Sequence, residues 1–272
     1  MAPPVLGPRR SIEGSFEAVE GYPESKSFVK KYWNVVADYD GSISPVPKHI
    51  SSLEFLADIP NKKITRGDVR AKFSFPIDQK AIFWTIVWGY ERGRIGNNPD
   101  NMIRALVNAQ EMANEVNHIT DTIAREGPLP SQQIIERLNN AGKVGTSTSS
   151  KVAAMARIQS LEGECVILDR QVIASIFYHR FADFKELERI MMPRTIDGRA
   201  CLGERIDKSF NRREDFYADY VRRLSELAST LGSEPEQIER FLFRSVPDME
   251  PINRRWKHIK EKRERAATRQ LT

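Results

Sequence analysis

The segment from Leu138 to Arg170 constrains the fold more than any other part of the chain. Its sequence, LNNAGKVGTSTSSKVAAMARIQSLEGECVILDR, predicts a helix end, a glycine-containing hairpin and a second helix with Lys151 in its first turn. A short apolar run, Cys165-Val166-Ile167-Leu168, then leads to Asp169. The segment therefore predicts two helices joined by a hairpin. It also predicts that the amine of Lys151, in the second helix, and the carboxylate of Asp169 lie in one region.

The remainder of the chain favours helices. Asn98-Pro99-Asp100 has a capping residue, a proline at the first helical position and an acid in the first turn, which together predict a helix start. The apolar residues that follow keep a spacing of three to four as far as about Glu126. Similar patterns predict helices over 77–92, 129–141, 149–159, 170–181, 183–192, 216–231 and 233–243, the last with a capping box at 233–236.

No stretch of alternating strand pattern exceeds a few residues, so the predicted fold class is mostly α. We expect a less regular N-terminal extension over 1–75, with short helices near 25–37 and 48–57 and no assigned role. A helical domain is expected over 76–248 and a basic tail over 249–272. The tail carries eight Lys or Arg residues between Arg254 and Arg269.

Composition excludes several classes of protein. The sequence has no apolar run of membrane-spanning length and no apolar signal region at its start, so we expect a cytoplasmic protein. Its two cysteines are too few for a disulfide framework or for a metal or iron–sulfur site held by four cysteines. The net charge of +5 is compatible with a polyanionic partner.

Lys151 and Asp169 are the candidate reactive pair. Ser149 or Ser150 is expected to cap the helix of Lys151, so the amine would lie near the positive end of the helix dipole, which favours a neutral, nucleophilic form. Asp169 is expected where the apolar run leaves the core, and could stabilise a cationic sugar transition state. The alternatives are a solvated lysine at a helix start and an aspartate that only caps a helix.

The hairpin Gly142-Lys143-Val144-Gly145 is a candidate phosphate-binding turn. Two glycines allow the backbone to turn tightly and to present N–H groups outward. A plain helix–turn–helix connection is the alternative. The sequence does not match a P-loop, because Val144 follows Gly142-Lys143 where that motif needs Ser or Thr.

Taken together, this segment resembles the helix–hairpin–helix DNA glycosylases. The similarity is to the 8-oxoguanine DNA glycosylase/AP lyase branch, and within it to a divergent bacterial group with the OGG fold. The matching residues are Lys151 and Val166-Ile167-Leu168-Asp169-Arg170, and the resemblance covers roughly 77–245. It implies Lys151 as the Schiff-base nucleophile, Asp169 as the catalytic carboxylate, DNA as the partner and no metal or organic cofactor.

Enzymes that act on a base extrude it from the duplex into a pocket. Aromatic side chains lie close in sequence to arginines that could bind phosphate, in Trp88-Gly89-Tyr90 followed by Arg92 and Arg94. The expected DNA-binding residues are Gly142, Lys143, Gly145, Arg92 and Arg94, and the candidate base-pocket residues are Trp88, Tyr90, Phe177 and Phe216.

The sequence is compatible with three functions. The first is a DNA glycosylase with lyase activity on an oxidised or otherwise modified base. The second is a helix–hairpin–helix DNA-binding protein without catalysis, in which Lys151 only contacts phosphate. The third is a helical interaction protein that does not bind nucleic acid, and it predicts no salt-dependent DNA affinity.

Overall fold

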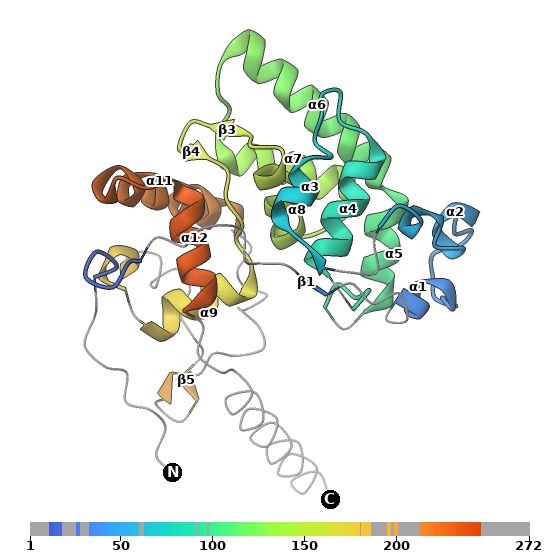
Figure 1. Cartoon of the computed structure of the whole chain (residues 1–272), viewed down its shortest axis with the longest axis horizontal. Helices are drawn as coiled ribbons and strands as arrows, with labels where there is room; N and C mark the ends of the chain where they lie inside the picture. The colour runs from blue at the N-terminus through green and yellow to red at the C-terminus, as the bar shows by residue number, and fades with distance from the viewer. Residues whose placement is uncertain are drawn as a thin grey trace, which may run out of the picture.

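The computed structural model of the chain describes residues 11–17, 26–27, 33–59, 63–90, 92–96, 98–179, 181–185, 195–196, 199–200 and 213–245. The predicted mostly α class is confirmed: helices pack around a common core, and the described strands are two residues each (Figure 1). The strands pair antiparallel as β1 (Lys26–Ser27) with β2 (Lys63–Ile64), β3 (Gln159–Ser160) with β4 (Gly163–Glu164), and β5 (Thr195–Ile196) with β6 (Arg199–Ala200).

Helix α4 (Gln79–Gly89) forms the centre of the core. Asp78 caps it by accepting a hydrogen bond from the backbone N–H of Ala81 at 3.0 Å. Every residue from Ala81 to Trp88 is buried, so the helix is covered on all sides rather than along one stripe. It packs on α3 (Arg66–Arg70), α6 (Ala109–Glu126) and α8 (Thr146–Met155).

The helix predicted from Asn98 starts as expected. The Asn98 side chain accepts from the N–H of Asp100, and Pro99 is the first helical residue. However, the single helix predicted to Glu126 is divided at Asn108 into α5 (Pro99–Val107) and α6. The Asn108 side chain donates to the carbonyl of Arg104 at 2.7 Å, and this local bond competes with the helical ladder.

The C-terminal helices lie on the opposite side of the molecule from α1 (Asn34–Ala37) and α2 (Lys48–Ser51) (Figure 1). They are α9 (Arg170–His179), α11 (Arg213–Leu231) and α12 (Pro235–Arg244), with the 3₁₀ turn η3 (Ala182–Phe184) after α9. For the helix predicted over 183–192, residues 182–184 form η3, and 186–194 lie outside the described residues.

The predicted capping box before α12 is wrong. Glu234 occupies the cap position without a side-chain hydrogen bond, and Pro235 is the first helical residue. The Ser233 hydroxyl bonds to Gln237 instead. The Glu236 carboxylate is not available to close the box, because it pairs with Arg66 and Arg70 of α3.

Residues before Pro76 contribute to the same hydrophobic core as the later helices. The buried residues include Trp33, Ile50, Leu56 of η2 (Glu54–Leu56) and Val69 of α3. Of the span predicted as a helix near 25–37, residues 26–27 form β1 and 34–37 form α1, while 28–32 lie outside the described residues. The helix predicted near 48–57 is divided into α2 and η2. The division at 75/76 stays a prediction, and Cys201 and the basic tail lie outside the described residues.

Candidate active site

The hairpin between α7 (Ser131–Gly142) and α8 is made by Lys143 rather than by a glycine. Lys143 adopts the left-handed conformation, with φ 52° and ψ 39°, and its N–H bonds to the carbonyl of Asn139. The next N–H, of Val144, is donated to the same carbonyl. Lys143 therefore closes α7, and its side chain is exposed.

The two glycines of the hairpin have different roles. Gly142 is buried against α6, where an added Cβ would lie 2.0 Å from Met112 Cε, so the Met112 side chain occupies the space that a larger residue would need. Gly145 is exposed, and an added Cβ would meet no described atom within 4 Å. It is the N-cap of α8 and supplies no side chain to the helix start.

Helix α8 begins at Thr146, so Lys151 lies in its second turn and not in the first as predicted. Ser149 and Ser150, the predicted caps, belong to the helix itself, and both are buried in the protein. The Ser149 hydroxyl donates to the side chain of Asn139 in α7 at 2.7 Å. Ser150 bonds instead to the segment that leads to Asp169.

The apolar run before Asp169 is buried without belonging to a sheet. Its backbone is satisfied by neighbouring side chains: Ser150 Oγ accepts from the N–H of Leu168 at 3.1 Å. The hydroxyls of Tyr217 and Tyr220 in α11 donate to Val166 and Ile167. Burial raises the pKa of both tyrosines well above the usual value of 10.0, so they remain donors at neutral pH. Since Ser150 precedes Lys151 and Leu168 precedes Asp169, the Ser150–Leu168 bond aligns the candidate pair.

Asp169 is both a helix cap and a partner of Lys151. One carboxylate oxygen, Oδ1, accepts from the N–H groups of Gln171 and Val172 at 2.9 and 3.1 Å. The other, Oδ2, lies 3.7 Å from Lys151 Nζ. The cap and the contact with Lys151 are compatible, because each uses a different oxygen.

The Lys151 side chain is only 4% exposed. Its amine donates to Ser147 Oγ at 3.0 Å and to the Ser147 carbonyl at 3.4 Å. The ring of Tyr90 lies beside it, with its centroid 5.3 Å from Nζ. Sequence reasoning did not assign Ser147 or Gly89 to this site. The i, i+4 spacing of Ser147 and Lys151 is a weak signal of their proximity. No spacing signals Gly89, where an added Cβ would lie 2.9 Å from Lys151 Cδ.

The other predicted site residues fall into three groups. Arg92 and Arg94 are exposed and follow Tyr90, at the end of α4 that faces Lys151. Trp88 and Phe216 are buried in the core, at 3% and 2% exposure, and present almost no surface to a ligand. The side chain of Phe177 lies outside the described part of the structure.

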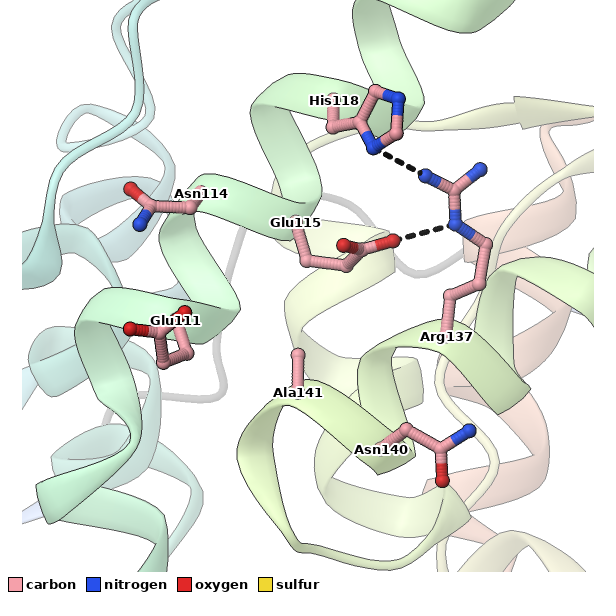
Figure 2. A pocket seen from close by; sticks show the side chains of 7 residues that line it. All are labelled: Glu111, Asn114, Glu115, His118, Arg137, Asn140 and Ala141. Carbon is pink, nitrogen blue, oxygen red and sulfur yellow. Dashed lines mark hydrogen bonds and ion pairs between the residues drawn. The ribbon is translucent and has the colours of Figure 1, made fainter.

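A polar hollow of about 490 Å³ lies between α6 and α7, away from Lys151 and Asp169. In Figure 2, Glu115 and His118 of α6 point toward Arg137 of α7 and contact its guanidinium group. The lining residues are Glu111, Asn114, Glu115, His118, Arg137, Asn140 and Ala141. Among the described residues, no three His, Cys, Asp or Glu side chains are grouped to hold a metal ion.

Within the described ranges, no helix has both the length and the apolar character needed to cross a membrane. Comparison with curated proteins and with solved structures finds no match. A family model described as "Putative 8-oxoguanine DNA glycosylase OGG-like protein" matches residues 28–243. The match begins well before residue 77, where the resemblance was expected to start, so most of the N-terminal segment is part of the family's common sequence. The chain belongs to this OGG-like family of DNA glycosylase-related proteins.

Proposed function

We propose that the protein is a DNA glycosylase with AP lyase activity that removes an oxidised or otherwise modified base. The observation that carries the proposal is the pair formed by Lys151 and Asp169. A buried amine lies 3.7 Å from a carboxylate oxygen: Lys151 belongs to α8, which follows the hairpin, and Asp169 directly precedes α9. This is the arrangement that amine-catalysed cleavage of a glycosidic bond needs.

The chemistry uses Lys151 as nucleophile and Asp169 as its partner. Asp169 accepts a proton from the ammonium group, and the neutral amine attacks C1′ of the damaged nucleotide. The base leaves with the electrons of the glycosidic bond and takes up the proton held by Asp169, and the carboxylate so restored stabilises positive charge at C1′. The sugar opens to an imine, loss of a C2′ proton expels the 3′ phosphate, and water releases the lysine. The reaction so written consumes no metal or organic cofactor.

DNA would be held by the hairpin and by the end of α4. The exposed backbone at Gly145 and the first N–H groups of α8 suit a phosphate. Lys143, Arg92 and Arg94 add exposed positive charges. Gly142 contributes by letting α7 pack closely on α6. The alternative function is a DNA-binding protein without catalysis, which would keep these contacts and make no covalent adduct.

Asp169→Asn separates the two roles of the aspartate. Asn caps a helix as well as Asp does, so Oδ1 still accepts from Gln171 and Val172 and α9 should still form, although the buried Lys151 loses its ion-pair partner. An amide NH₂ in place of Oδ2 cannot accept a proton from Lys151 or stabilise a cation. We expect adduct formation to slow by about 100-fold, measured in single-turnover trapping. A normal rate in a correctly folded variant would remove Asp169 from the mechanism.

Borohydride trapping tests the proposal. The wild-type protein is incubated with labelled duplexes that contain 8-oxoguanine or an abasic site, and the imine is reduced to a stable amine. We expect a covalent protein–DNA band whose peptide map places the adduct on Lys151. A salt-dependent complex with both duplexes but no covalent band with either favours the alternative function. Absence of any DNA binding would contradict both.

A further inference from the structure

Gly89 and Tyr90 end α4 directly against Lys151. An added Cβ at Gly89 would lie 2.9 Å from Lys151 Cδ and 3.3 Å from Cε. The lysine stem therefore occupies the space that any larger residue would need. The backbone of Gly89 is helical and its φ is not positive. Since glycine is unfavourable in a helix relative to alanine, the contact with Lys151 is the reason that the structure offers for glycine at this position.

Tyr90 joins α4 to α8 beside the amine. Its hydroxyl is hydrogen-bonded to Thr148 Oγ1 at 2.8 Å, and Thr148 precedes Lys151 by three residues. The bond fixes the ring, whose centroid lies 5.3 Å from Lys151 Nζ. This distance is within the range of a cation–π contact.

Ser147 completes the surroundings of the amine. Its hydroxyl and its carbonyl both accept from Lys151 Nζ, while Asp169 lies slightly further away. The stem thus rests on Gly89, and the amine is bounded by Ser147, Asp169 and the Tyr90 ring. With so little of the side chain exposed, the direction in which the amine can reach a sugar carbon is set by these neighbours.

We propose that Gly89 and Tyr90 are positioning residues for Lys151: they fix the direction of its amine toward C1′. The proposal rests on the proposed function, since it assigns these residues a role in that reaction. It also gives Tyr90 a role other than contact with the damaged base. The ring and hydroxyl of Tyr90 are already engaged with Lys151 and Thr148.

Gly89→Ala tests the role of the glycine. The nearest atoms belong to a flexible side chain, so the lysine shifts while the helix keeps its backbone. Alanine also favours the helix, and the melting temperature should stay the same or rise. We expect single-turnover borohydride trapping on an abasic duplex to slow by about 100-fold, the effect of a displacement of the reacting group of about 1 Å. Affinity for a tetrahydrofuran duplex, which cannot form an imine, should be unchanged.

Gly14→Ala is the matched control, because an added Cβ at Gly14 meets no described atom within 4 Å. It should leave both the trapping rate and the affinity at wild-type values. If Gly89→Ala traps as fast as the wild type, the positioning role of Gly89 is overturned while the proposed function stands. If the wild type itself makes no adduct, the proposed function and this inference fall together.

Tyr90→Leu separates positioning from base recognition. An abasic duplex contains no base at the damaged position, so a residue that only stacks on the base is dispensable there. We expect Tyr90→Leu to slow trapping on the abasic duplex by about 10-fold, with unchanged affinity for the tetrahydrofuran duplex. Thr148→Val, which removes the partner of the hydroxyl, should slow the same step. Slowing confined to duplexes that contain 8-oxoguanine would instead make Tyr90 a base-contact residue and overturn its positioning role.

Discussion

Lys151→Gln is expected to abolish the borohydride-trapped adduct while DNA binding is retained. A glutamine amide has no nucleophilic lone pair and cannot form an imine, so the rate of adduct formation should fall by at least about 1,000-fold. The side chain is almost fully buried and has little surface for contact with phosphate. Affinity for a tetrahydrofuran duplex should therefore stay near the wild-type value.

Lys143→Gln is the matched control for this substitution. Lys143 is exposed in the hairpin, so its loss should weaken DNA binding and lower the salt dependence of binding by about one unit. At saturating protein the adduct should still form. A persistent adduct in Lys151→Gln, mapped to another lysine, would contradict the assignment of the nucleophile.

Several local features of the fold could be predicted from sequence, because their causes are local. The start of α5 follows from Asn98 and Pro99, since a capping side chain and a proline act within one turn. The apolar spacing of α6 likewise marks the face that is buried. The hairpin was located correctly, although its left-handed residue is Lys143. The pattern of two glycines does not indicate that Lys143 makes the turn or that Gly142 packs against α6.

The start of α8 was predicted too late because hydroxyl residues have two uses in helices. Thr146 to Ser150 are common cap residues with weak helical preference, so sequence favoured a loop that ended at Ser149 or Ser150. In the structure, most of these side chains are buried, and Ser149 and Ser150 bond to α7 and to the run before Asp169. Tertiary packing thus overrides propensity, and Lys151 is still brought to Asp169.

Contacts between distant segments were beyond the reach of sequence patterns. Nothing in the spacing around Gly89 indicates that Lys151 will lie on it. Similarly, Arg66 and Glu239 are 173 positions apart, yet they form a bidentate pair in the interior. Such pairs depend on how α3 and α12 meet, which the helix predictions alone do not fix.

Arg66→Met is expected to lower the free energy of unfolding by about 3–5 kcal/mol, the cost of removing one partner from a buried ion pair. The Arg66 guanidinium donates to Glu236 at 2.9 Å and to Glu239 at 2.8 and 3.1 Å. Arg66 and Glu239 are at most 2% exposed. Methionine keeps most of the volume of the stem but leaves the carboxylates in the interior without this cation. Denaturant unfolding at neutral pH measures the loss.

Arg223→Met is the control, because Arg223 forms an exposed pair with Glu226. This substitution should change the free energy of unfolding by less than about 1 kcal/mol.

The pH dependence of the Arg66→Met effect distinguishes lost charge pairing from lost packing. Burial alone would raise the pKa of Glu236, but Arg66 and Arg70 outweigh it and hold that pKa below its usual 4.5. A lowered folded-state pKa contributes stability above pH 4.5, and this contribution is lost as the pH falls through the folded value. The difference between wild type and Arg66→Met should therefore shrink well below pH 4.5, where Glu236 is protonated. A pure packing defect would give the same difference at neutral pH and at low pH.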